Sequence, residues 1–155
     1  MPLTLSLTSE RWPIAGTFSI SRGAKTEAAV VVAELSDGTA RGRGECVPYA
    51  RYGESVEGVL GTIEALRPQL ALGLSRAGLQ TSLPPGAARN ALDCALWDLA
   101  AKREGRPVHE LASCPVPHAV TTAFTISLAA PEDMAKAAAK AASRALFKIK
   151  LGASR

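Results

Sequence analysis

The stretch from His118 to Gly152 switches between two kinds of pattern, and it restricts the fold more than any other part of the sequence. It starts with HAVTTAFTIS, which is typical of a strand, and continues with APEDMAKAAAKAASRA, which is typical of a helix with Pro131 in its first turn. It ends with LFKIKLG, which is again typical of a strand. Two strands joined by a helical crossover of this length pair in parallel, and such βαβ units are the repeat of barrels and doubly wound sheets. We therefore expect a parallel sheet in this part of the chain.

The second of these strands carries two lysines, Lys148 and Lys150, on one face, because side chains alternate faces with a period of two. An exposed edge strand that uses lysine to prevent pairing with other chains would explain them simply. Strands of a parallel sheet are normally covered on both faces, however, so two lysines are costly there unless they face a polar interior, a cleft or the strand's end. In a (β/α) barrel the active site lies at the carboxyl ends of the strands, and both lysines lie just before Leu151-Gly152, where this strand should end. The pair is therefore a candidate site.

Paired lysines of this kind favour one type of chemistry. A second ammonium group and partial desolvation both favour the neutral form of a lysine amine. Lys150 could then act as a base while Lys148 holds a positive charge near an anionic substrate. Abstraction of a proton next to a carboxylate is the reaction that would need this arrangement. The resulting enediolate normally requires a divalent metal that several carboxylates hold.

The amino-terminal part of the chain has a different pattern. LTLSLTSERWPI alternates apolar and polar residues, and two further strands flank Asp37-Gly38, so we expect a three-stranded antiparallel meander. Between the first two strands lies GTFSISRGAKTE, which carries Arg22 and Lys25 and is longer than a hairpin needs. We interpret this stretch as a loop that serves as a lid.

Two helices should follow the meander. The first starts after Ser55, a suitable N-cap, and Pro68 should kink or end it. The second, in SLPPGAARNALDCALWDLAAKREGRP, is longer, ends near Gly105 and presents alanines that let another element approach closely. The change of pattern near SCPVP predicts a capping domain of residues 1–115 and a second domain of residues 116–155.

Composition excludes several classes of protein. The chain has 155 residues, of which 47% are hydrophobic and 21% are charged, so it can bury a core. A net charge of +4 without dense basic and aromatic patches argues against nucleic-acid binding, and the sequence offers neither a membrane span nor a signal peptide, so we expect a cytoplasmic protein. Cys46, Cys94 and Cys114 are far apart and form no Cys-x-x-Cys pair, so we expect reduced thiols, with neither a disulfide nor a zinc site.

Four blocks in this order resemble the enolase superfamily: SRG, GRGECVPYARYGES, GAARNALDCALWDLAAKREGRPVHEL and KIKLG. Within that superfamily the chain is most similar to the dipeptide epimerases, which interconvert L-Ala-D-Glu and L-Ala-L-Glu. The resemblance implies an α+β capping domain, a three-stranded antiparallel meander with helices, followed by the first βαβ unit of an incomplete (β/α) TIM-type barrel. It also implies the chemistry described above, with Mg²⁺ as the cofactor.

The resemblance assigns roles to individual residues. Lys150 would be the base on one face of the substrate α-carbon, with Lys148 as its electrostatic partner. Arg22 in the lid would bind a substrate carboxylate, and Thr125 at the end of the first barrel strand would contact the substrate. A solvated loop arginine and a strand threonine bonded locally remain the alternatives at these two positions.

Other polar residues are interpreted as structural: Tyr52, Glu54, Glu45 and Asp98. The acids at the start of the predicted helix after Pro131 favour that helix end and are not interpreted as metal ligands. The family's metal-binding acids lie on later barrel strands, and so does the lysine that acts on the opposite face of the substrate α-carbon. No metal ligand is therefore assigned in this chain.

A (β/α) barrel needs about 200 residues or more, so we expect the chain to be the amino-terminal portion of a longer enzyme and to be inactive alone. Its substrate would be a small acidic dipeptide derived from peptidoglycan, and it would need the missing barrel segment, with a homo-oligomer as one form of the complete protein. Three related activities stay open: N-acylamino-acid racemase, muconate cycloisomerase and o-succinylbenzoate synthase. A non-catalytic capping-domain module that binds a partner is the alternative outside enzymology.

Overall fold

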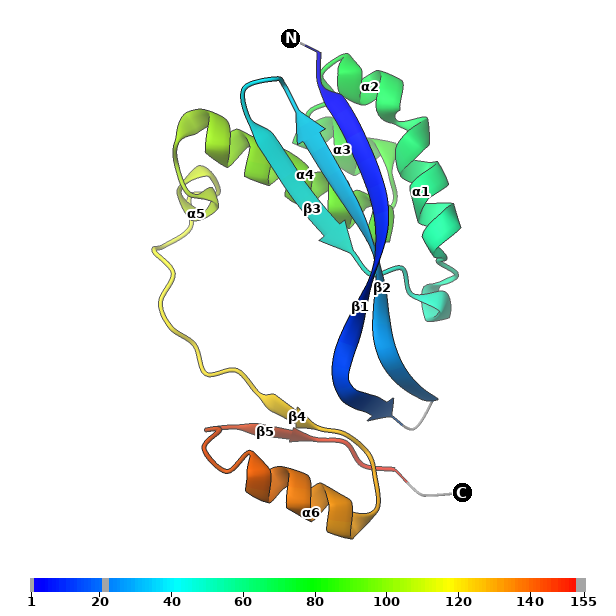
Figure 1. Cartoon of the computed structure of the whole chain (residues 1–155). Helices are drawn as coiled ribbons and strands as arrows, with labels where there is room; N and C mark the ends of the chain where they lie inside the picture. The colour runs from blue at the N-terminus through cyan, green and yellow to red at the C-terminus, as the bar shows by residue number, and fades with distance from the viewer. Residues whose placement is uncertain (1, 21–22, 153–155) are drawn as a thin grey trace. The chain divides into compact units, whose positions relative to one another are not determined.

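The computed structural model describes residues 2–20 and 23–152, and it contains one antiparallel and one parallel sheet (Figure 1). The antiparallel sheet has the strand order β1-β2-β3, and the parallel sheet pairs β4 with β5. Both the expected meander and the expected βαβ unit are therefore present. The elements in chain order are β1 (Thr4–Ile20), β2 (Gly23–Ser36), β3 (Arg41–Cys46), η1 (Ala50–Tyr52), α1 (Val56–Ala65), α2 (Arg67–Ala71), α3 (Arg76–Ser82), α4 (Ala87–Glu104), α5 (Val108–Leu111), β4 (Phe124–Ile126), α6 (Pro131–Lys140) and β5 (Phe147–Ile149).

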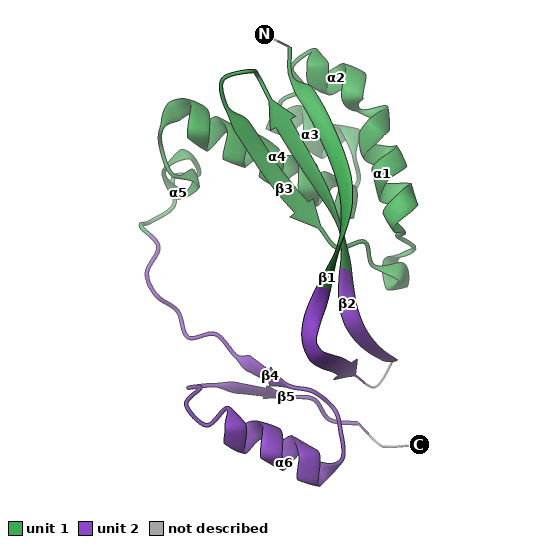
Figure 2. Ribbon diagram, viewed as in Figure 1, with its two compact units in different colours: residues 1–12, 29–116 green, residues 13–28, 117–155 purple. Residues whose placement is uncertain are grey.

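The chain divides into two compact units (Figure 2). The first unit comprises residues 1–12 and 29–116, and the second comprises residues 13–28 and 117–155. The second unit is thus built from two separate stretches of sequence. The domain limits 1–115 and 116–155 stay a prediction.

The turn between β2 and β3 follows the expected chemistry of Asp37-Gly38. The Asp37 carboxylate accepts hydrogen bonds from the backbone amides of Thr39 and Ala40, each at 2.8 Å, and Gly38 adopts a positive φ of 89°. Beyond the turn the strands pair antiparallel, with Ser36 opposite Arg41.

The prediction of a loop between the first two strands is wrong, because the strands extend through most of that stretch. β1 continues to Ile20 and β2 begins at Gly23, so most of the stretch is strand. Residues such as Thr17 and Phe18 favour extended backbone. Gly16 adopts a positive φ of 85°, a conformation that glycine reaches without steric cost. We call this part of the hairpin, residues 13–20 and 23–28, the hairpin arm.

The core of the first unit lies between the antiparallel sheet and the helices α1, α3 and α4. Strand β3 contributes Gly42 and Gly44 to this face, and both lie directly on the backbone of α4. A Cβ atom added to Gly44 would overlap the carbonyl oxygen of Ala91 and lie 2.6 Å from the amide nitrogen of Ala95. The contact therefore requires residues without side chains on the strand. The buried cluster consists of Leu5, Val31, Ala33, Leu35, Cys46, Val59, Ile63, Leu66, Leu70, Leu79, Ala87, Ala91, Leu92, Ala95, Leu96 and Leu99.

Helix α4 also covers the free edge of β3. The backbone amide of Arg43 donates to the Asp98 carboxylate at 2.8 Å, and the Asn90 side-chain amide donates to the carbonyl oxygen of Glu45 at 3.1 Å. Backbone groups that an edge strand would expose are thereby satisfied within the chain.

The helix boundaries follow local signals in most places. Ser55 caps α1 by accepting from the amide of Gly58 at 3.0 Å, and the chain breaks at Leu66 before α2, which has Pro68 in its first turn. Gly105 ends α4 at a φ of 61°, as expected. The structure also contains α3, which the sequence analysis did not predict. None of the helices in the described ranges is long and apolar enough to cross a membrane.

In the second unit, β4 is shorter than predicted, since it covers only Phe124–Ile126 of the stretch that begins at His118. The preceding residues 118–123 are exposed. The Phe124 and Phe147 rings meet edge to face, with centroids 6.5 Å apart, and Ile126 is 2% exposed. Helix α6 lies on one side of the strand pair (Figure 1).

Candidate functional site

The paired lysines lie at the carboxyl end of the parallel strand pair. Thr125 of β4 is the register partner of Lys148 of β5, and Ile126 is the partner of Ile149. The Lys150 amide donates to the Ile126 carbonyl oxygen at 3.1 Å, which continues the parallel ladder past Ile149. Partners in register share a face, so Thr125, Lys148 and Lys150 lie on the same face of the pair. We call these three residues the lysine row.

The two faces of this pair differ in character. One carries the aromatic contact between β4 and β5 and the buried Ile126. The other carries the lysine row, in which Lys148 is exposed and Lys150 is half-buried. Two strands alone leave much apolar surface open, because Ile149 is 55% exposed and Leu151 is 84% exposed.

The hairpin arm belongs to the same compact unit as the lysine row. Within that unit the backbone amide of Leu128 donates to the carbonyl oxygen of Ser19 at 3.2 Å. This bond attaches the arm to the chain just after β4. Arg22, the expected carboxylate-binding residue, lies outside the described residues.

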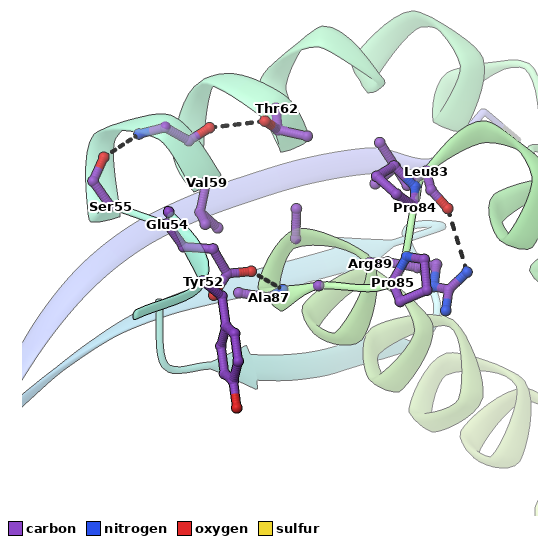
Figure 3. Close-up of a pocket in the computed structure, with 14 residues that line it drawn as sticks. Tyr52, Glu54, Ser55, Val59, Thr62, Leu83, Pro84, Pro85, Ala87 and Arg89 are labelled. Carbon is purple, nitrogen blue, oxygen red and sulfur yellow. Dashed lines mark hydrogen bonds between the residues drawn. The ribbon is translucent and has the colours of Figure 1, made fainter. Parts of the chain in front are cut away.

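The first unit contains a pocket of about 350 Å³ between the start of α1 and the start of α4 (Figure 3). Four of its polar side chains bond to backbone groups: Glu54, Ser55, Thr62 and Arg89. Glu54 accepts from the amide of Ala87 at 2.7 Å, and Arg89 donates to the carbonyl oxygen of Leu83 at 3.3 Å. Glu54 and Arg89 thus hold the backbone around the pocket, which is a structural role.

Glu54 fixes the start of α4. Besides Ala87, it accepts from the backbone amide of Tyr49 at 3.0 Å. The hydrogen bonds from the Ala87 and Tyr49 amides hold the pKa of Glu54 below its ordinary value, since they favour the charged form. The carboxylate thus replaces an N-cap side chain that Gly86 cannot supply. Tyr52 is 76% exposed and contacts Tyr49, with ring centroids 5.9 Å apart.

Asp98 also has structural partners. Burial raises its pKa, but hydrogen bonds from Lys102 and from the Arg43 amide outweigh burial, so the pKa lies below its ordinary value. Lys102 donates at 2.7 Å, one turn along α4. Glu45, on the outer face of β3, lies 3.9 Å from Arg43.

The described residues do not fit a metal site. Within residues 2–20 and 23–152, no three His, Cys, Asp or Glu side chains form a group that could hold a metal ion. Glu132 and Asp133 lie in the first turn of α6, where acids favour the helix. The three cysteines are free, and burial raises the pKa of the Cys46 thiol to about 11.

Sequence reasoning missed two glycines that shape the molecule. Gly42 and Gly44 were not identified as contacts of α4, although their alternation with charged residues in RGRGE was a usable signal.

Residues 3–112 match the family model described as mandelate racemase / muconate lactonizing enzyme, N-terminal domain. The chain belongs to this family. The match covers the meander with its hairpin arm, η1 and the helices α1–α5.

Two curated relatives of this family member are an epimerase and a racemase. The chain is 47% identical over 150 residues to the L-Ala-D/L-Glu epimerase of Escherichia coli (strain K12), with 96% of this chain and 47% of the relative covered. It is 40% identical over 126 residues to an N-acetyl-D-glutamate racemase of a Pseudoalteromonas species, with 79% and 39% covered. Both relatives are isomerases. The chain thus spans less than half the length of each of these relatives.

Solved structures that resemble this chain include dipeptide epimerases and a related enolase family member. An enolase family member from Agrobacterium tumefaciens with homology to dipeptide epimerases, which contains sodium and L-Ala-L-Glu, matches with a TM-score of 0.93 and 50% identity over 99% of this chain and 47% of that one. A dipeptide epimerase from Cytophaga hutchinsonii, in complex with Mg and D-Ala-L-Val, matches with a TM-score of 0.85 and 26% identity over 99% and 45%. The resemblance to the enolase superfamily and the expected fold class are confirmed.

Proposed function

We propose that this chain is the amino-terminal part of a dipeptide epimerase that interconverts L-Ala-D-Glu and L-Ala-L-Glu. The observation that carries the proposal is the lysine row at the carboxyl end of β4 and β5, in a chain that is 47% identical to the epimerase of Escherichia coli. Barrel enzymes place catalytic residues at this end of their strands. The proposed domain limits are residues 1–115 for the capping domain and 116–155 for the start of the barrel.

In the proposed reaction, the amine of Lys150 takes the α-proton of the substrate. The electron pair of the broken C–H bond moves into the adjacent carboxylate to form an enediolate. A lysine outside residues 1–155 then returns a proton to the opposite face of the α-carbon, which inverts it. The charge of Lys148 attracts the substrate carboxylate, and the hydroxyl of Thr125 contacts the substrate from the neighbouring strand.

The proposed cofactor is Mg²⁺, with all of its ligands outside residues 1–155. Solved relatives contain magnesium or sodium, whereas the described residues supply no ligand set. Arg22 is proposed to bind the acidic end of the dipeptide. Its neighbours in the hairpin arm support this role, because Ser19 bonds to the chain just after β4.

The proposed active form needs the remaining barrel strands. A two-stranded parallel sheet leaves backbone groups and apolar residues such as Ile149 and Leu151 open, and further strands would cover both. We propose that residues 1–155 alone are inactive and that the complete enzyme is cytoplasmic. Three free cysteines support that compartment.

The test is α-proton exchange in D₂O, followed by ¹H NMR, with the complete protein encoded by the whole reading frame. We expect exchange with L-Ala-D-Glu and L-Ala-L-Glu in the presence of Mg²⁺, and loss of exchange from one epimer in Lys150→Ala. Lys136→Ala is the matched control, because Lys136 is an exposed lysine of α6 that forms a surface pair with Asp133 at 3.5 Å. Absence of exchange with both dipeptides contradicts the proposal.

The Pseudoalteromonas relative favours a second candidate, a racemase of N-acylated amino acids. The same assay with N-acetyl-D-glutamate distinguishes the two. Faster exchange of N-acetyl-D-glutamate than of either dipeptide would favour the racemase, and exchange of none of these substrates would favour a non-catalytic module.

A further inference from the structure

We propose that Ser127 positions the amine of Lys150 through a hydrogen bond from its side chain. This inference rests on the proposed function, because it concerns the residue that is proposed to take the α-proton. It extends the lysine row by a residue that the sequence analysis did not assign.

The parallel ladder places Ser127 beside Lys150. Thr125 is in register with Lys148 and Ile126 with Ile149, and the same register continued by one residue past the two strands brings Ser127 opposite Lys150. The bond of 3.1 Å from the Lys150 amide to the Ile126 carbonyl oxygen holds this register at the strand end. Register partners lie about 5 Å apart, which is within reach of a flexible lysine side chain.

Ser127 shares the face of the lysine row. It follows Thr125 by two residues, just as Lys150 follows Lys148. Each lysine therefore has a hydroxyl residue as its neighbour on the adjacent strand: Thr125 beside Lys148 and Ser127 beside Lys150.

The Ser127 hydroxyl is available for this role. Both Ser127 and Lys150 are half-buried, and within residues 2–20 and 23–152 their side chains are not hydrogen-bonded to each other or to other groups, so the proposed bond is one that forms when the Lys150 side chain turns toward Ser127. The backbone just after it is fixed, because the Leu128 amide donates to the carbonyl oxygen of Ser19 at 3.2 Å. A hydroxyl can accept from a lysine ammonium and donate to a lysine amine, so it can hold Nζ in both states of the base.

Holding the amine matters because proton transfer depends steeply on geometry. A displacement of about 1 Å between reacting groups can cost about a hundredfold in rate. A free lysine side chain has several rotatable bonds, and one hydrogen bond near its end restricts them. Ser127 is thus a positioning residue that acts through Lys150.

The experiment compares Ser127→Ala, Ser127→Thr and Ser143→Ala in the complete protein. Ser143 is an exposed serine of the same βαβ unit and serves as the matched control. Exchange of the α-proton with D₂O is measured separately for L-Ala-D-Glu and L-Ala-L-Glu, together with the midpoint of urea unfolding. In Ser127→Ala we expect about a tenfold fall in exchange from the epimer whose α-hydrogen faces Lys150. Exchange with retention from the other epimer should persist, because the opposite lysine removes that proton.

Ser127→Thr should restore most of the loss, since it keeps the hydroxyl. Unchanged exchange in Ser127→Ala, an equal fall for both epimers at an unchanged unfolding midpoint, or a failure of Ser127→Thr to restore the rate would each overturn the inference and leave the proposed function intact. If the unsubstituted protein exchanges neither dipeptide, the proposed function fails and this inference fails with it.

Discussion

Substitution of Gly44 by alanine should disrupt the contact between β3 and α4. The new Cβ would overlap the Ala91 carbonyl oxygen and lie 2.6 Å from the Ala95 nitrogen and 2.9 Å from the Ala91 carbonyl carbon. Real Cβ atoms essentially never come closer than 3.0 Å to such atoms. All three are backbone atoms of α4, so no side-chain rotation can relieve the overlap.

The helix would have to move away from the strand by about 1 Å or more, and overpacking of this kind costs about 1–3 kcal/mol. Such a shift also stretches the hydrogen bonds that join Asn90 and Asp98 to the edge of β3. Each of these contributes about 0.5–1.5 kcal/mol. We therefore expect the free energy of unfolding to fall by about 2–6 kcal/mol, out of a total of about 5–15 kcal/mol for an ordinary domain.

Urea unfolding monitored by circular dichroism measures this change. Gly61→Ala is the matched control, because a Cβ on Gly61 in α1 meets no atom within 4 Å. Alanine there should raise the free energy of unfolding by about 0.5–1 kcal/mol, since glycine disfavours a helix interior. A Gly44→Ala variant within about 1 kcal/mol of the original chain would refute the close contact.

Three further predictions concern other parts of the first unit. The pKa of Asp37 is lowered in the folded protein by hydrogen bonds from the Ala40 amide, Arg103 and Thr39. The charged Asp37 should therefore contribute its full stabilisation above the pKa of the unfolded chain, about 4. This stabilisation should be lost as the pH falls through the lower pKa of the folded protein. Urea titrations of the original chain and of Asp37→Asn should therefore differ at pH 6 and converge in strong acid; a constant difference would contradict this. Asp98→Ala frees a backbone amide at the edge of β3 and should increase self-association in analytical ultracentrifugation, whereas Asp93→Ala, on the same helix, should not. A thiol reagent at pH 8 should modify the exposed cysteines within minutes and the buried Cys46 only on unfolding, because burial raises the pKa of its thiol to about 11; rapid labelling of all three would contradict this.

Local signals in the sequence were sufficient where one or two residues determine the backbone. Asp37-Gly38 predicted the hairpin turn, and Pro68 predicted the break between α1 and α2. Predictions failed where the outcome depends on distant partners. Residues 118–123 have a strand pattern but belong to no strand in the structure, and α3 is too short to show a clear period.

In the candidate site, too, the sequence predicted the features that local pattern determines and missed those that distant partners determine. The period of two placed Lys148 and Lys150 on one face without any tertiary information. The alignment of Lys148 with Thr125 depends on the register of β4 with β5, which the sequence does not reveal. Likewise, the partners of Asp98 and Glu54 come from remote segments, so the sequence indicated a structural role but not the groups that they bind.

The hairpin arm means that the chain cannot be dissected by a single cut. Cleavage at residue 116 would remove β4, α6 and β5 but keep the arm, whose half-buried Ile14, Phe18 and Ile20 belong to the departing unit. The truncated piece would then carry a long apolar ribbon with nothing to cover it, a form prone to aggregate. Any exchange of capping domains between relatives should accordingly keep the arm with residues 117–155 of its own chain, as a graft with three junctions, at residues 12/13, 28/29 and 116/117, rather than one.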